Sequence, residues 1–484
     1  MIDRPSGAAR SLRLAELDRS LEQNPDATEA RFERAGLFRE QGRFEDARRD
    51  YIELLRRTPT DFGALNDFGT LVLNAGYKTA ARSLFAAAVE HHPDNPRGHV
   101  NLANLLFLTG ELEQARVHFE AALRLDPNHT HAHRGIGNLL AEQGDAAGAR
   151  SHRDKAFTTR FMTALPYRGE GAPISALLLV SAAGGNIPTR SILDDRQFQT
   201  TLLVTEYADP AVPLPRHDIV FNSIGDADLC REGLEAACHV LTRTDRPVIN
   251  DPRAVLKTGR VANVERLRGL PNVVVPRMVI LPKRSLSGPE AAAVVKANGF
   301  AFPFLVRAPG FHTGRFFVRV EDQQGLSAAA EFPGDDLCLI DELDARDDGG
   351  CFRKIRVMII DRKIYPLHLA ISRHWKVHYF RADMADSPDN RAKDAALLAD
   401  MPSFIGAHGM AALERINAAL DLDYCGIDFA VNRAGDILFF EANATMVLVP
   451  LSGAQKWDYR RPAFDKVFAA VRAMLLQRSH GVAV

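Results

Sequence analysis

Three oxygen-bearing side chains near the C-terminus have the types and the spacing of a cation site. Asp428 lies in the apolar run GIDFAV, and Glu441 and Asn443 lie in the run ILFFEAN. The segment NRAGD between them has the Asn and Gly of a hairpin turn, so the two runs are predicted to be paired strands. If the turn holds an even number of residues, strand alternation places all three side chains on one face of the sheet.

The spacing of this trio leaves two interpretations open. The three residues are either the solvated face of an antiparallel sheet or the ligands of a hard cation. The other positions of both strands are large and apolar, which indicates a sheet covered on both faces, where a carboxylate needs a partner. Mg²⁺ satisfies this need because it binds a few protein oxygens together with nucleotide phosphates.

Length and composition set the frame for these strands. The 484 residues predict two or three domains, and a net charge of −1 gives no electrostatic attraction to nucleic acid or anionic membranes. No apolar run approaches the roughly 18 residues of a membrane span, and the first 20 residues lack a signal peptide. The five cysteines are scattered, which favours reduced thiols. We therefore expect a cytoplasmic globular protein.

The first third of the chain repeats itself at a period of 34 residues. A proline, a leucine, a glycine and an alanine each recur in all copies, a small residue recurs at a fifth position, and three copies share an aromatic residue. The members are Pro25, Pro59, Pro93 and Pro127; Leu37, Leu71, Leu105 and Leu139; Gly42, Gly76, Gly110 and Gly144; Ala47, Ala81, Ala115 and Ala149; Ala35, Gly69, Ala103 and Gly137; and Tyr51, Phe85 and Phe119.

This pattern predicts one helix pair per repeat, with the glycine ending the first helix and the proline preceding the next pair. It resembles the tetratricopeptide repeat, in four copies over residues 24–156, and residues 11–22 resemble the second helix of a truncated unit. The resemblance implies a groove for a peptide or protein partner, or self-association into a homodimer. Four asparagines either bond a peptide backbone or are ordinary helix residues: Asn66, Asn101, Asn104 and Asn138. The spacing of His129, His131 and His133 on a helix disfavours a metal site.

The middle of the chain alternates apolar strands, loops and a helix. Residues 174–181, 199–206 and 217–223 are predicted strands, and residues 227–242 a predicted helix, which together favour a small sheet of parallel strands. Ligands bind beyond the carboxyl ends of such strands. The candidates there are substrate contacts or structural turn residues: Gly184, Gly185, Asn186, Asn222 and Asn250. The loop AAGGNIPT is not the GxGxxG dinucleotide motif, so a nicotinamide cofactor is not supported.

From about residue 247 to the C-terminus the chain resembles the ATP-grasp enzymes, such as glutathione synthetase, D-alanine:D-alanine ligase and the ribosomal-protein glutamate ligases. The resemblance rests on several motifs in family order. FPFLVRAPGFHTGRFFVRV matches the strand, glycine loop and strand over the triphosphate, and LCLIDELDA matches the hinge that holds adenine and ribose. FRKIRVMIIDRKIYPLHL matches the core strands, and the hairpin with the acidic trio follows.

The resemblance implies a role for each matching residue. Asp428, Glu441 and Asn443 would bind Mg²⁺, and the phosphates of ATP would contact basic residues and the glycine loop. The implied nucleotide-binding residues are Arg260 (with Lys257 as a competitor), Arg307, Gly310, Gly314, Arg315, Asp341, Glu342 and Leu343. Arg356, Arg373 and Lys376, with Lys354 as a further choice, would stabilise charge during catalysis. By its own composition, the segment of residues 372–384, unusually rich in His, Trp, Lys and Tyr, is either the part that recognises the acceptor or a structural strand and loop.

The expected fold is multidomain. A tetratricopeptide solenoid over residues 1–165 precedes an α/β pre-ATP-grasp domain over 166–275 and an α+β ATP-grasp domain over 276–484. The expected activity is an ATP-dependent ligase that joins a carboxylate to an amine or another nucleophile through an acylphosphate, with the repeats recruiting a peptide or protein. The alternatives are a non-catalytic scaffold with a degenerate nucleotide site and an ATP-grasp kinase.

Overall fold

A computed structural model describes residues 7–311, 314–377, 382–448 and 455–480. The chain divides into two compact units. The first, which we call the repeat unit, comprises residues 1–161, 166–173 and 195–197. The second, the sheet unit, comprises residues 162–165, 174–194 and 198–484. The finer partition into three domains stays a prediction.

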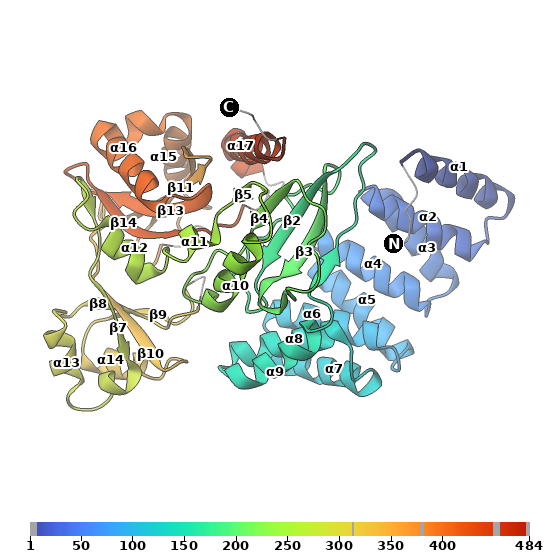
Figure 1. Ribbon diagram of the computed structural model, residues 1–484, viewed down its shortest axis with the longest axis horizontal. Coiled ribbons are helices and arrows are strands. Elements are labelled where there is room, and N and C mark those ends of the chain that lie inside the picture. The colour runs from blue at the N-terminus through green and yellow to red at the C-terminus, as the bar shows by residue number, and fades with distance from the viewer. Residues whose placement is uncertain (1–6, 312–313, 378–381, 449–454, 481–484) are drawn as a thin grey trace. The chain divides into compact units, whose positions relative to one another are not determined.

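Where it is described, the repeat unit has only helices as regular structure, and Figure 1 labels them in chain order. Helix α1 precedes four helix pairs, each joined by a short turn. The bounds are α1 Gly7–Gln23, α2 Thr28–Glu40, α3 Phe44–Arg57, α4 Phe62–Asn74, α5 Lys78–His91, α6 Pro96–Thr109, α7 Leu112–Leu125, α8 Thr130–Glu142 and α9 Ala146–Phe157. The predicted helix pairs are confirmed, and α1 covers the helix predicted over residues 11–22.

The repeated residues explain the pairs. The turn glycine after the first helix of each pair has a positive φ, from +73° at Gly42 to +92° at Gly76, a conformation that favours glycine. The small residues allow close helix approach, because a methyl group on Gly69 would come within 2.5 Å of the Phe85 ring. Phe85 is itself buried. Small and large side chains thus interlock between the two helices of a pair.

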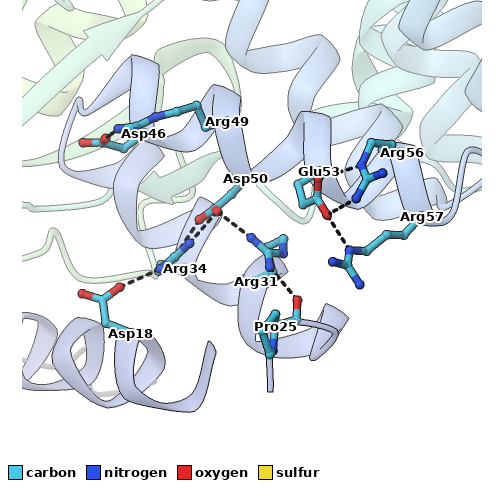
Figure 2. A network of polar contacts seen from close by, with 10 residues as sticks. All are labelled: Asp18, Pro25, Arg31, Arg34, Asp46, Arg49, Asp50, Glu53, Arg56 and Arg57. Atoms are coloured by element: carbon cyan, nitrogen blue, oxygen red, sulfur yellow. Dashed lines mark hydrogen bonds and ion pairs between the residues drawn. The ribbon is translucent and has the colours of Figure 1, made fainter. Parts of the chain in front are cut away.

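A polar network joins the first three helices (Figure 2). The buried carboxylate of Asp50 on α3 accepts two hydrogen bonds from Arg34, at 2.8 and 2.7 Å, and one from Arg31 at 3.4 Å. Arg34 also donates to Asp18 of α1 at 2.8 Å. A buried carboxylate requires such partners, so this network fixes α1 and α3 against α2.

The sheet unit begins with a five-stranded sheet of order β1-β3-β2-β4-β5. The strands are β1 Met162–Ala164, β2 Ile174–Val180, β3 Phe198–Val204, β4 Ile219–Asn222 and β5 Val248–Ile249. Strands β2 to β5 are parallel, as predicted, and β1 adds an antiparallel edge. The predicted helix after β4 is α10, Arg231–Leu241.

A four-stranded antiparallel sheet of order β7-β10-β8-β9 follows. Its strands are β7 Met278–Pro282, β8 Phe304–Arg307, β9 Phe317–Val320 and β10 Asp336–Ile340. Helices α13, Ala291–Ala297, and α14, Gln323–Ala329, pack on it through a core that includes Phe304, Val306 and Leu339. The glycine loop of the sequence lies between the paired strands β8 and β9.

The third sheet has five strands in the order β12-β11-β13-β14-β6. They are β6 Val273–Val274, β11 Phe352–Ile360, β12 Lys363–Ser372, β13 Tyr424–Val431 and β14 Ile437–Asn443. Val357 and Ile359 pack with the core of α15, Pro388–Ala399, and α16, Met401–Leu420, which lie together in Figure 1. The alternate residues Met358 and Ile360 pack with α17, Arg461–Ser479. The sheet is therefore covered on both faces, as predicted.

Short elements complete the sheet unit. These are η1 Thr205–Tyr207, α11 Pro252–Val255, α12 Arg260–Leu267, η2 Lys283–Leu286 and η4 Gln455–Arg460. Among the helices that the structure describes, none alone has the length and apolar composition of a membrane span. Helices α15 and α16 meet that test only together, as a pair bent by 64°.

Candidate functional site

The predicted hairpin is present, but its turn has an odd number of residues. Strands β13 and β14 are joined by residues 432–436, where the Asn432 side chain accepts hydrogen bonds from the backbone of Ala434 and Asp436. A regular hairpin with this turn would place Asp428 opposite Phe440. A bulge at Phe440 shifts the register, so that Phe429 pairs with Phe439 while Asp428 pairs with Glu441. The bulge, and not an even turn, therefore brings the two acids together.

Charged residues form a row across three neighbouring strands. Arg356 on β11 lies opposite Asp428 on β13, which lies opposite Glu441 on β14. Arg356 donates two hydrogen bonds to the Asp428 carboxylate, at 2.6 and 2.7 Å, and the Nζ of Lys354 lies 3.1 Å from Asp428 Oδ2. The Asp428 side chain is 1% exposed. The row thus contains a buried, bidentate ion pair with a second cation beside it.

The surroundings of Asp428 and Arg356 favour their charged forms. Burial alone would raise the pKa of Asp428, but the charges of Arg356 and Lys354 outweigh it and hold that pKa well below its usual range. Burial alone would lower the pKa of Arg356, but the charge of Asp428 outweighs this effect and raises that pKa above its ordinary value. Asp428 is therefore an anion throughout the neutral pH range.

Glu441 faces a second pair of cations. Burial acts to raise its pKa, but the charges of Arg260 and Arg307 help to bring that pKa below its ordinary value. Arg260 Nη2 lies 3.6 Å from Glu441 Oε2, and Arg260 also approaches Asp228 at 4.0 Å. Burial lowers the pKa of Arg307 to about 10, and its Nε has no hydrogen-bond partner among the described residues. Arg307 therefore has an unused donor beside Glu441.

Asn443 completes the predicted trio at the end of β14. It pairs with Gly426 of β13, and its Oδ1 accepts a hydrogen bond from Thr445 at 3.1 Å. Since Asn443 stands two residues after Glu441 on the same strand, the two side chains share a face. Asp428, Glu441 and Asn443 thus lie on one face of the third sheet.

The trio and the basic residues line one cavity of about 1110 Å³ in the sheet unit. Seven basic and four acidic side chains border it, which gives a formal excess of three positive charges. The basic residues are Arg260, Arg307, Arg315, Arg353, Lys354, Arg356 and Lys376, and the acidic ones are Asp341, Glu342, Asp428 and Glu441. Such a cavity suits an anion with several charges.

One end of the cavity is apolar and borders the expected hinge. Met278, Leu305 and Ile340 are adjacent on paired strands, and all line the cavity with Leu343. In the hinge after β10, Asp341 donates its backbone N–H to the carbonyl of Arg277 at 2.9 Å. Glu342 accepts a hydrogen bond from Arg319 at 2.7 Å. Apolar side chains of this kind suit a flat, uncharged group beside these polar atoms.

Lys376 lines the cavity and bonds to the backbone of the glycine loop and of β9. Its Nζ donates to the carbonyl of Gly314 at 2.5 Å and to that of Phe317 at 2.9 Å. Gly314 has φ +74°, and Arg315 stacks against the rings of Phe311 and Phe316 at 5.4 Å each. The expected catalytic Lys376 therefore contacts the glycine loop directly. Residues 312–313 of that loop lie outside the described residues.

Several sequence candidates lie away from the cavity lining. The Arg373 side chain is exposed, and its backbone N–H bonds Asp383 at 2.9 Å. Gly310 has φ +80° and belongs to the loop backbone without lining the cavity. Lys257 is exposed, and of the two competing residues Arg260 lines the cavity. Of the acceptor segment, Trp375, Lys376 and Val377 line the cavity. Residues 378–381 lie outside the described residues.

The parallel sheet contributes two of its five candidates to the cavity, Gly185 and Asn186. Asn222 and Asn250 have structural roles. Asn222 donates to the Asn250 carbonyl at 2.9 Å, and Asn250 donates to the Tyr424 carbonyl at 2.7 Å. Gly184 has φ +100° and is also a turn residue.

Sequence reasoning missed three features of the site. Asp228, which bonds the backbone of Arg260 at 3.1 Å, lies in a loop with no motif of its own. His368 on β12 stands opposite Arg356, and burial holds its pKa well below the ordinary value. Phe317 borders the cavity beside Arg307, with which it pairs across β8 and β9. The alternation of charged and apolar residues in FRKIRV and PLHL was the available signal for His368.

The trio offers the donor types that Mg²⁺ prefers. Two carboxylates and one amide provide oxygen ligands, and each carboxylate has about four acceptor positions, more than Asp428 uses. No group of three or more His, Cys, Asp or Glu residues that could hold a metal occurs within the parts of the chain that are described. The trio contains only two such residues, so any metal here would depend on the amide and on ligand oxygens as well.

The predicted groove asparagines partly satisfy one another. Asn66 is buried and accepts a hydrogen bond from Asn101 at 2.6 Å. Asn104 is exposed and Asn138 partly exposed. Asn66 is thus engaged between two neighbouring repeats, whereas Asn104 is accessible to a partner.

Comparison with known families identifies the repeats. The tetratricopeptide repeat family matches residues 8–62 and residues 96–129. The N-terminal region therefore consists of tetratricopeptide repeats, the architecture of a protein-interaction scaffold. A comparison with curated proteins gives no match.

Three solved structures illustrate the similarity. PilF of Pseudomonas aeruginosa is 21% identical, with 30% of this chain and 67% of that chain covered and a TM-score of 0.29. YrrB, described as a repeat protein with an unusual peptide-binding site, is 21% identical over 31% of this chain and 78% of its own, with a TM-score of 0.28. TTC0263 of Thermus thermophilus is 21% identical over 32% and 84%, with a TM-score of 0.28.

Proposed function

We propose that the sheet unit is an ATP-grasp ligase, which uses ATP and Mg²⁺ to join a carboxylate to an amine or another nucleophile. The observation that carries the proposal is the single cavity in which an excess of basic side chains meets Asp428, Glu441 and Asn443. A nucleoside triphosphate needs this combination, because its phosphates require cations and its metal requires oxygens.

The two ends of the cavity suggest how ATP would lie. The adenine fits the apolar end formed by Met278, Leu305 and Ile340, with the backbone of residues 341–343 beside it. The phosphates fit the basic part, where Arg260 and Arg307 flank Glu441. This orientation supports the assignment of the acidic trio to the metal that accompanies the phosphates.

The chemistry follows in two steps. An oxygen of the substrate carboxylate bonds to the γ-phosphorus as the bond to the bridging oxygen breaks, giving an acylphosphate and ADP. The nucleophile then bonds to the acyl carbon, phosphate leaves and the nucleophile loses a proton. Mg²⁺, held by the trio, would neutralise charge on the phosphate oxygens. Arg356 and Lys354 supply fixed positive charge beside the site, so that positioning and electrostatics dominate.

The repeat unit supplies the second part of the proposal. Tetratricopeptide repeats bind peptide or protein partners, so the substrate or a partner enzyme is proposed to be recruited on them. A groove built from four helix pairs is large for a free amino acid, and this favours modification of a peptide or protein.

One observation favours a second candidate, a scaffold that binds nucleotide without turnover. The Asp428 carboxylate is already engaged by three nitrogen donors, on Arg356 and Lys354. If these contacts persist with ATP present, Asp428 would be a structural anion and the site would lack one metal ligand.

A product assay separates the candidates. The full chain is incubated with ATP, Mg²⁺ and candidate carboxylates and nucleophiles, and the products are identified by mass spectrometry. A ligase gives ADP, phosphate and a joined product. A phosphorylated product without joining would indicate a kinase, and unchanged ATP with measurable ATP binding would indicate the scaffold.

A further inference from the structure

One pair of positions recurs in all four repeats, with one position on each helix of a pair. The first position lies six residues after the loop proline, and its partner lies 19 residues further along the chain. The successive pairs are Arg31 and Asp50, Leu65 and Leu84, His99 and His118, and His133 and His152. Figure 2 shows the first pair, where Arg31 contacts Asp50 at 3.4 Å and also donates to the Pro25 carbonyl at 2.6 Å.

Histidines occupy these positions in the last two repeats with the same contacts. His99 Nδ1 lies 3.1 Å from His118 Nδ1, and His99 Nε2 lies 2.8 Å from the Pro93 carbonyl. His133 Nδ1 lies 2.9 Å from His152 Nδ1, and His133 Nε2 lies 2.9 Å from the Pro127 carbonyl. We call these two pairs the histidine couples. His99 and His133 are 8% and 4% exposed.

The contacts limit how many protons each couple can hold. Nε2 of His99 must carry a proton to bond the Pro93 carbonyl, and one further proton must lie between the two Nδ1 atoms. The couple can take up one more proton, on Nε2 of His118, and keep both hydrogen bonds. A couple in which both rings are fully protonated has two N–H groups facing each other, so its link between the helices is lost. The same argument applies to His133 and His152.

The surroundings of His118 and His152 disfavour proton uptake by the two couples. Burial lowers the pKa of His118, and the charge of His99 acts in the same direction. Burial also lowers the pKa of His152, and there His133 and Lys155 on α9 both contribute. The neighbouring charges named here are all positive, so they add to the cost of a further proton on His118 or His152. In the first repeat, by contrast, Asp50 neutralises Arg31.

We propose that the two histidine couples make the third and fourth repeats, residues 96–157, an acid-labile half of the array, while the first two repeats stay closed. A histidine that resists protonation when folded contributes stability above its unfolded pKa of about 6.5, and that stability falls as pH drops through this value. Each unit by which folding lowers such a pKa makes opening about tenfold easier at low pH. A partner that binds the last two repeats would be released as the pH falls below this value.

The second repeat provides the control variant, because the chain has Leu65 and Leu84 at the same positions. The test compares the full wild-type chain with the fourfold variant H99L/H118L/H133L/H152L. Hydrogen exchange, corrected for its intrinsic pH dependence, is measured by mass spectrometry at pH 7.5 and pH 5.5. We expect protection over residues 96–157 to fall about tenfold or more at the lower pH in the wild type. Protection over residues 28–91 should stay unchanged in both proteins. Over residues 96–157 the variant should lose clearly less protection than the wild type, although it keeps His131 on α8, whose pKa burial also lowers.

Two outcomes would overturn the proposal: equal protection at both pH values in the wild type, or an equal loss in the leucine variant. If the variant does not fold, the titration of His118 and His152 is measured in the wild type from their ring resonances by NMR. His118 and His152 must then titrate below the ordinary value near 6.5. Titration at or above that value would refute the proposal.

Discussion

Asp428 is a buried anion whose two neutralising cations differ in geometry. Arg356 donates two hydrogen bonds to the carboxylate, whereas Lys354 makes one contact with it at 3.1 Å. Replacing Arg356 by methionine would leave the carboxylate buried with only the lysine, so we expect a loss of about 3 kcal/mol in the free energy of unfolding. Urea denaturation of the purified variant measures this loss.

Lys354→Met is the matched control for that experiment. It removes the weaker contact and keeps the bidentate pair, so its cost should be clearly smaller than that of Arg356→Met. The pH dependence gives a further check. A carboxyl group with a lowered pKa stabilises the fold above its unfolded value of 3.8, and this contribution is lost as pH falls below it. In this acidic range the free energy of unfolding of Arg356→Met should therefore depend less on pH than that of the wild type. An unchanged pH dependence would show that the pair of Arg356 and Asp428 does not cause it.

At this scale the sequence predicted types of residue better than contacts. Asp428, Glu441 and Asn443 could be chosen because acids within apolar strands need partners. Their actual partners could not be chosen, since Arg356, Lys354 and Arg260 approach from other segments of the chain. Arg373 was predicted for its charge within a basic stretch, but charge alone does not determine whether a side chain points into a cavity.

At the scale of elements, the hairpin shows how a correct pairing can rest on a wrong premise. The strands and the turn residues were predictable from NRAGD, but the turn length is odd. The bulge at Phe440 corrects the register by one residue. A bulge depends on how two strands pair, and no local signal in ILFFEAN marks it.

The repeat helices give a paired prediction about glycine. A methyl group on Gly69 would meet the Phe85 ring at 2.5 Å, so Gly69→Ala should destabilise the repeat unit by about 1–3 kcal/mol. Gly36 also lies within a helix, and a methyl group there has nothing within 4 Å. Gly36→Ala should therefore stabilise by about 0.5–1 kcal/mol, because alanine is the better helix former. Thermal unfolding followed by circular dichroism measures both, and equal effects of the two changes would contradict the packing argument.

The helix pairs themselves were predictable because the residues that pack the two helices together recur every 34 residues in all four repeats. Gly42, Gly76, Gly110 and Gly144 all have positive φ, as their recurrence indicated. The histidine couples were not predicted, since His99 and His118 are separated by 19 residues and only the pairing of α6 with α7 joins them.

At the scale of the whole molecule, all the proposed nucleotide contacts belong to the sheet unit. Binding of ATP with Mg²⁺ should therefore raise hydrogen-exchange protection in β11, β13 and β14 and leave α2 to α9 unchanged. At a concentration one hundred times the dissociation constant, the expected gain is about 2.7 kcal/mol for amides that exchange by opening of the sheet unit. The same measurement with ADP and no metal is the control, and protection confined to the repeat helices would contradict the assignment.

The order of folds along the chain was accessible from the sequence, because helical repeats and apolar strands differ in periodicity. The division into two units was less so. Residues 166–173 and 195–197 belong with the repeats although they lie within the strand-rich segment. Arg168 explains part of this, since it donates to the carbonyl of Glu40 at 2.9 Å, a contact over 128 positions that no local pattern encodes.

The most direct test of the proposed ligase is the ATP turnover of Glu441→Gln. Glutamine keeps the size of the side chain and removes the charge that faces Arg260 and the proposed metal. Glu265→Gln, which changes an exposed glutamate that pairs with Arg268, is the matched control. Once a substrate that supports turnover is known, we predict that Mg²⁺-dependent release of ADP falls at least about a hundredfold in Glu441→Gln and not in the control. Equal turnover in the wild type and Glu441→Gln would contradict the proposed site.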